Sequence, residues 1–147
     1  IPGKFDYLRH TADIYVVVYG SNVLELLENA GLALFHSMTD LVKLEPAEER
    51  AVEARGFDLE NTLYKWLEEL LILYYSENFM CREVRVLEFS IRREKGDFAY
   101  TVKGVCRGEK FNPAKHEPRV EVKAVTYHLM RVVKDEELWR AYFVLDI

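Results

Sequence analysis

Residues 84–106 have the sequence VRVLEFSIRREKGDFAYTVKGVC, and this stretch decides the class of the fold. On both sides of Lys95-Gly96-Asp97, hydrophobic side chains alternate with polar ones, which is the period of a half-buried strand. Glycine and aspartate adopt the backbone conformations of tight turns. The stretch therefore predicts an antiparallel β-hairpin, and a slip of the alternation at Leu87 indicates a β-bulge.

Two helices are expected before this hairpin. Asn22 and Glu25 resemble a capping box, and the hydrophobic residues that follow recur at helical spacing over about four turns. Asp58 is well placed to cap a second helix. The apolar residues of that helix fall on one stripe: Leu59, Leu63, Trp66, Leu67, Leu70, Leu71 and Tyr74. Each helix is therefore expected to bury one face against a sheet.

Further strands are expected on both sides of these elements. They are Ile14 to Tyr19, closed by Gly20, then Glu49 to Arg55, Val120 to Val133 and Leu138 to Asp146. Residues 107–118 contain one glycine and two prolines and are expected to form a long surface loop. The sum is an α+β fold: a single domain over residues 1–147, with two helices packed on a mainly antiparallel sheet.

Composition and charge limit the partners and the location. The net charge is −5, with 25 acidic and 20 basic side chains, so no broad positive field attracts a phosphate backbone. Any nucleic acid is expected to be held by a partner. No apolar run is long enough to span a bilayer, and no signal peptide is evident, so no membrane contact is expected. Cys81 and Cys106 are too few and too far apart in the sequence for a disulfide framework, which favours a reducing cytoplasm.

Three carboxylates could meet at one end of the sheet. Asp13 directly precedes a buried strand, and the apolar segment Leu138 to Leu145 leads to Asp146 and the α-carboxylate of Ile147. If the strands that carry them pair, the three anions repel one another unless some are protonated or a divalent cation neutralises them. An all-oxygen site suits Ca²⁺, Mg²⁺ or Mn²⁺ better than zinc.

Simpler interpretations of the same residues exist. Terminal acids are commonly just solvated, and a short polar run before a strand is commonly a turn. His10 could give Mn²⁺ a nitrogen ligand, or it could only hydrogen-bond to a carboxylate.

Three segments together resemble the archease family, over nearly the whole chain. They are His10-Thr11-Ala12-Asp13, Lys123-Ala124-Val125-Thr126-Tyr127-His128 and the terminal Val144-Leu145-Asp146-Ile147. The resemblance implies that Asp13, Asp146 and the carboxylate of Ile147 bind a divalent metal. It also links Lys123 to function, where its charge could meet a phosphate or carboxylate of a partner; otherwise it is a strand lysine that faces water.

One position departs from the family pattern. Many archeases have an acidic residue just before the histidine of the first motif, whereas this chain has Arg9. A cation there lowers the negative charge beside the site, although it removes no matched ligand.

The resemblance also implies a function. Archeases assist an RtcB-type RNA ligase in tRNA splicing: they promote guanylylation of the ligase by GTP and so allow multiple turnover. The chain shows neither a glycine-rich phosphate loop nor a nucleophile arrangement, which agrees with a helper that is not itself an enzyme. Two alternatives are a phosphoesterase with Asp13, His10 and Asp146 around Mg²⁺ or Mn²⁺, and a metal-stabilised chaperone or binding module with other RNA-processing clients.

Overall fold

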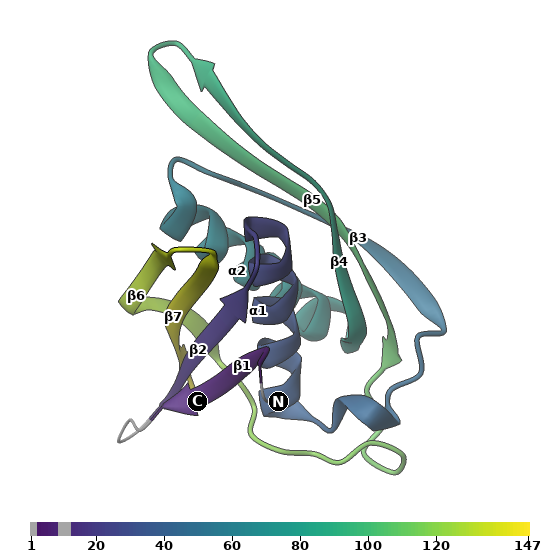
Figure 1. Ribbon diagram of the computed structural model, residues 1–147. Helices are drawn as coiled ribbons and strands as arrows, with labels where there is room; N and C mark the ends of the chain where they lie inside the picture. Colours follow the sequence, from purple (N-terminus) through teal and green to yellow (C-terminus); the bar gives the residue numbers. More distant parts are fainter. Residues whose placement is uncertain (1–2, 9–12) are drawn as a thin grey trace.

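The computed structural model describes residues 3–8 and 13–147, and its strands form two antiparallel sheets. The first sheet has the order β1 (Phe5–Leu8), β2 (Ile14–Gly20), β7 (Leu138–Asp146), β6 (Ala124–Asp135). The second has the order β3 (Glu48–Gly56), β5 (Asp97–Lys110), β4 (Phe79–Glu94). Helices α1 (Val23–Met38) and α2 (Leu59–Glu77) lie between the sheets, and a short 3₁₀ helix, η1 (Leu41–Lys43), follows α1 (Figure 1).

The α+β class and the two helices are confirmed, whereas the expectation of one sheet is wrong. Both helices begin where their caps predict: the Asn22 side chain accepts the Glu25 N–H at 2.9 Å, and the Asp58 side chain accepts the Asn61 N–H at 2.7 Å. Because α1 has a sheet on either side, it is buried over most of its surface. Gly31 permits this close packing, since a Cβ there would lie 2.9 Å from Leu70 and 3.1 Å from Val84.

The predicted hairpin is β4 with β5, and it extends beyond the helices (Figure 1). Its turn has positive φ at both Lys95 (51°) and Gly96 (86°), the backbone of a type I′ turn. A register shift between Val86 and Glu88 confirms the bulge predicted at Leu87. A second register shift, between Cys81 and Glu83, was not foreseen.

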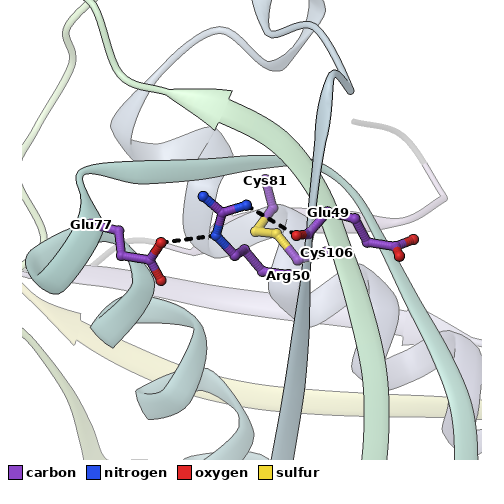
Figure 2. The surroundings of a disulfide bond; sticks show 5 residues. All are labelled: Glu49, Arg50, Glu77, Cys81 and Cys106. Atoms are coloured by element: carbon purple, nitrogen blue, oxygen red, sulfur yellow. Dashed lines mark hydrogen bonds and ion pairs between the residues drawn. A yellow bond between two sulfur atoms is a disulfide. The ribbon is translucent and has the colours of Figure 1, made fainter.

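The cysteine interpretation is wrong, because Cys81 and Cys106 form a disulfide (Figure 2). The residues are 25 apart in the sequence, but the hairpin returns β5 alongside β4 and brings their Cα atoms to 5.5 Å. Both are fully buried. Arg50 lies beside them and donates from Nε to Glu77 Oε1 at 2.9 Å. The cysteines therefore no longer argue for a reducing compartment.

The strand boundaries differ from expectation in the last third of the chain. Residues 120–123 are not part of β6, which begins at Ala124. This segment is held instead by individual hydrogen bonds near its two ends. The N–H of Arg119, just before it, donates to Met38 O at 3.0 Å, and the N–H of Lys123 donates to Asp146 O at 2.7 Å. Strand β1 was also not predicted, because its four residues are too short to show a pattern.

No helix within residues 3–8 and 13–147 is both long and apolar enough to cross a bilayer.

Reduction of the Cys81–Cys106 disulfide should lower the free energy of unfolding by about 3 kcal/mol, because the bond closes a loop of 25 residues in the unfolded chain. Guanidinium titrations with and without a phosphine reductant measure this difference. The Cys81→Ala/Cys106→Ala variant is the control and should not respond to the reductant. Two free thiols in the denatured, unreduced protein would contradict the prediction.

Candidate functional site

Strands β2 and β7 bring the two candidate aspartates together. They pair antiparallel with Ile14 opposite Leu145, so Asp13 and Asp146, the next residue outward on each side, lie at the same end of the pair. The pairing on which the metal hypothesis depended is therefore confirmed.

The alternation of side chains decides which face of the sheet carries these carboxylates. Val16, Phe143 and Leu145 are fully buried in the core between the sheets. Asp13 and Asp146 have the opposite parity, so they lie on the outer face of the first sheet. Both are partly exposed there, where water and a cation can reach them.

The terminal strand is held in place from its other side as well. Lys123 N–H donates to Asp146 O at 2.7 Å, and Thr126 Oγ1 donates to Val144 O at 3.0 Å. Val122, which precedes Lys123, is hydrogen-bonded to α2, because Tyr75 Oη donates to Val122 O at 2.5 Å. Chain ends are commonly poorly ordered unless they are tied down. Here hydrogen bonds from the neighbouring strand and the preceding segment fix Asp146.

Lys123 places its side chain on the surface just before β6, on the side of the sheet that faces α2. The residue is exposed, and it lines a shallow hollow of about 290 Å³ together with Tyr64, Ile72 and Tyr75. An exposed ammonium group agrees both with a partner contact and with a lysine that faces water. Its main-chain N–H, in contrast, has a defined partner in Asp146.

The described residues supply part of the expected ligand set. Within residues 3–8 and 13–147, no three side chains of His, Cys, Asp or Glu gather as a metal site. Asp13 and Asp146 are two oxygen donors, and the third expected donor is the α-carboxylate of Ile147, which is main chain. His10 and Arg9 lie outside the described residues. This donor set is all oxygen and fits Ca²⁺, Mg²⁺ or Mn²⁺, and the ligand roles stay a prediction.

A hollow beside Asp13 was missed by the sequence reasoning. It has a volume of about 370 Å³, and its walls come from β1, the start of β2, the last turn of α1 and the segment at 119–120. Its polar side chains include Tyr7, His36 and Arg119. The sequence signal was a histidine in the last turn of an amphipathic helix, which is weak.

The three polar residues form one hydrogen-bonded chain. Arg119 donates from Nη1 to His36 O at 3.0 Å and approaches His36 Nε2 at 3.4 Å. Arginine can only donate, so Nε2 accepts and the proton of His36 is on Nδ1. Nδ1 then donates to Tyr7 Oη at 2.7 Å, and Tyr7 O–H donates to Ala33 O at 3.3 Å. The network requires a neutral imidazole.

The titration of these groups agrees with the network. Burial, and then the charge of Arg119, lower the pKa of His36 below its ordinary value of 6.5. Burial raises the pKa of the Tyr7 hydroxyl, which therefore stays protonated. His36 and Tyr7 are both neutral near pH 7.

Acidification should weaken the fold through His36. A lowered pKa in the folded state means that the unfolded chain binds more protons, so stability present above pH 6.5 is lost as the pH falls through the folded-state pKa. Unfolding free energies between pH 7.5 and about pH 5 should therefore fall more steeply for the native protein than for His36→Gln. His128→Gln, at an exposed position, is the matched control. Equal slopes for native protein and His36→Gln would show that His36 is not involved.

Comparison with known proteins gives the same family throughout. Residues 5–147 match the Archease protein family. Protein archease of Sulfurisphaera tokodaii is 43% identical over 144 residues, which cover 98% of this chain and 99% of the relative. Protein archease of Thermococcus kodakarensis is 44% identical over 145 residues, with the same coverage of both chains.

Solved structures agree with this assignment. The solution structure of Methanobacterium thermoautotrophicum protein 1598 is similar with a TM-score of 0.78 and 36% identity, and the match covers 99% of each chain. A crystal structure from Thermotoga maritima, described as an archease and possible chaperone, has a TM-score of 0.55 at 24% identity over 95% of this chain and 94% of that one. This second likeness concerns the fold alone. By its family match and its relatives, the chain belongs to the archease family.

Proposed function

We propose that this protein is a non-enzymatic, cation-binding activator of an RtcB-type RNA ligase in tRNA splicing. In this proposal it promotes guanylylation of the ligase and multiple turnover. The observation that supports the cation site is the pairing of β2 with β7, which ends at Ile14 and Leu145 and leaves the adjacent Asp13 and Asp146 at one end of the sheet. The partner and the reaction come from the family to which the chain belongs.

The donor set supports a hard divalent cation. Asp13, Asp146 and the α-carboxylate of Ile147 present only anionic oxygen atoms, which Ca²⁺, Mg²⁺ and Mn²⁺ prefer. Carboxylates gathered at one end of a sheet would repel one another, so a bound cation would stabilise the folded protein. The bound ion would supply positive charge to a phosphate group brought by the partner. The strands supply rigidity, because both aspartates lie at the ends of paired strands.

Lys123 lies at the same end of the molecule and is exposed to a partner. Its exposed ammonium group lies beside the terminal strand and could meet a phosphate or a carboxylate of the ligase. The net charge of −5 favours indirect contact with RNA, through the ligase. The nucleophile in this proposal belongs to the ligase, and the compartment is the cytoplasm.

Asp146→Asn, or one residue added after Ile147, should abolish stimulation of ligation while the fold stays intact. The first change removes one anionic ligand, and the second displaces the α-carboxylate. Isothermal titration with Mn²⁺, Mg²⁺ and Ca²⁺ measures cation binding, and ligase guanylylation with GTP in the same three cations measures function. Asp97→Asn, in the hairpin turn, is the control and should behave as the native protein.

Other outcomes would favour other functions. Full stimulation by both variants would refute the terminal cation site. Cleavage of phosphodiesters by the purified protein alone would favour a phosphoesterase. A dominant partner other than the ligase in pull-downs from extract would favour a chaperone or binding module with different clients.

Lys123→Met should separate partner contact from cation binding. The main-chain N–H that holds Asp146 is retained, so cation affinity should stay within about twofold, a difference of roughly 0.4 kcal/mol. Stimulation of guanylylation should fall by about tenfold or more, the loss expected for one charged contact of about 1.5 kcal/mol. Lys103→Met, an exposed lysine on the other sheet, is the matched control. Unchanged stimulation by Lys123→Met would mean that this lysine only faces water.

A further inference from the structure

Strand β4 has an outer edge that the fold covers only in part. In the second sheet β5 lies between β3 and β4, so β4 is an edge strand. Near its middle, the N–H of Val86 donates to Glu28 Oε2 of α1 at 2.9 Å, so the helix covers the edge there. Beyond the bulge at Leu87 the hairpin extends past the helices (Figure 1), and within residues 3–8 and 13–147 no strand pairs with its outer edge. An uncovered edge is a template for another strand.

The geometry of the hairpin shows which backbone groups this edge offers. Glu94 and Asp97 flank the two-residue turn as a hydrogen-bonded pair, and the register with β5 then stays regular back to Glu88. In an antiparallel pair, hydrogen-bonded positions alternate with positions whose N–H and C=O groups point away from the partner. The backbone groups that point outward are therefore those of Phe89, Ile91 and Arg93.

The side chains along this edge are complementary to themselves about Ser90. If two copies of β4 pair antiparallel with Ser90 opposite Ser90 of the second copy, Glu88 of each copy lies opposite Arg92 of the other. On the opposite face, Phe89 of each copy lies opposite Ile91 of the other, and both of these positions have outward backbone groups. Opposite charges, and an aromatic ring beside a β-branched side chain, are favourable cross-strand pairs.

Neighbouring registers lack this match. Moving the two-fold axis to Ile91 sets Glu88 opposite Glu94 of the second copy, and like charges in directly opposite positions are destabilising. Moving the axis to Phe89 leaves both Glu88 and Arg92 without an opposite charge across the pair. The charge pattern of this edge therefore selects one register.

The same segment has apolar surface to bury. On the side of the sheet to which Val102 belongs, the hairpin carries Phe89, Ile91, Phe98 and Tyr100. Ile91 is 51% exposed and Phe98 is 55% exposed. Pairing of two copies would bring Ile91 of each against Phe89 of the other and remove part of this surface from water. A two-fold contact uses the same edge of both copies, so it closes at a dimer.

We propose that a second copy of this chain docks on the outer edge of β4, with Ser90 at the two-fold axis, in the middle of the uncovered stretch 87–93. The two three-stranded sheets then form one continuous sheet of six strands. This inference depends neither on the cation site nor on the ligase. The tip of the hairpin and the C-terminus lie at opposite ends of the molecule (Figure 1), so both C-terminal ends would stay uncovered in the dimer.

Charge reversal tests the register. In sedimentation velocity over a wide range of concentration, the mass of the full chain should rise from 17.3 kDa toward twice that value. Arg92→Glu should weaken dimerisation by about tenfold or more, because both cross-strand pairs change from attraction to repulsion. Arg92 lies opposite Ala99 in the hairpin, so this change disturbs the β4–β5 pair little. Addition of Glu88→Arg should restore dimerisation to within about threefold of native. Lys43→Glu, an exposed position on η1, makes the same change of charge and is the control.

Ser90→Cys tests the position of the axis. Residues in directly opposite, non-hydrogen-bonded positions have Cα atoms about 4.5 Å apart, a distance that a disulfide can span. Mild oxidation should therefore convert folded Ser90→Cys into a covalent dimer. Ser76→Cys, at an exposed position on α2, is the matched control and should stay monomeric on a denaturing, non-reducing gel.

Three results would overturn the proposal. They are a native protein that stays monomeric at every concentration, a folded Arg92→Glu that dimerises as the native protein does, and a Glu88→Arg/Arg92→Glu variant that dimerises no better than Arg92→Glu alone. Circular dichroism and thermal unfolding establish that each variant is folded. If the charge variants do not fold, the Ser90→Cys cross-link decides, and its absence in folded protein would refute the Ser90 axis.

Discussion

The antiparallel pairing of β2 with β7 is the constraint on which the rest of the candidate site depends. Ile14 and Leu145 are partners in this pair, and both pack into the core between the sheets. A slip by one residue would turn these side chains outward and move Asp13 and Asp146 to the apolar side. The same hydrophobic burial that stabilises the sheet therefore decides the face on which Asp13 and Asp146 lie.

The segment between β5 and β6 links the last turn of α1 to the terminal strand β7. It leaves β5, passes the last turn of α1 and runs into β6 beside the terminal strand. Arg119 bonds to the end of α1, and Lys123 N–H bonds to Asp146 O. Near its start, buried His116 accepts the Asn112 N–H on Nδ1 at 2.8 Å and contacts Glu109 at 3.1 Å. The loop expected at residues 107–118 is therefore partly wrong, because residues 107–110 belong to β5. The connection that follows is ordered by these bonds, and its Arg119 and Val120 line the hollow.

Short sequence patterns correctly predicted the helix caps, the turn and the bulge, which interactions between near neighbours in the chain produce. The Asn22 and Asp58 caps, the Lys95-Gly96 turn and the Leu87 bulge are all found where residue type and spacing indicated, because their hydrogen bonds and dihedral angles involve near neighbours. The division into two sheets was missed, because alternation shows that a strand has a buried face but not which strands share a sheet. The Cys81–Cys106 bond was missed for a related reason: sequence separation was used in place of distance, and the hairpin register removes that separation.

The sequence by itself determined the α+β class, the two capped helices and the long hairpin. The tertiary structure alone decided that Asp13 and Asp146 lie at the same end of the β2–β7 pair and that Lys123 lies beside the terminal strand. It also decided that Tyr7, His36 and Arg119 form one chain of hydrogen bonds around a hollow. The reason is physical. These contacts join residues far apart in the chain, and their geometry follows from strand register and helix packing, which depend on how the whole hydrophobic core is filled.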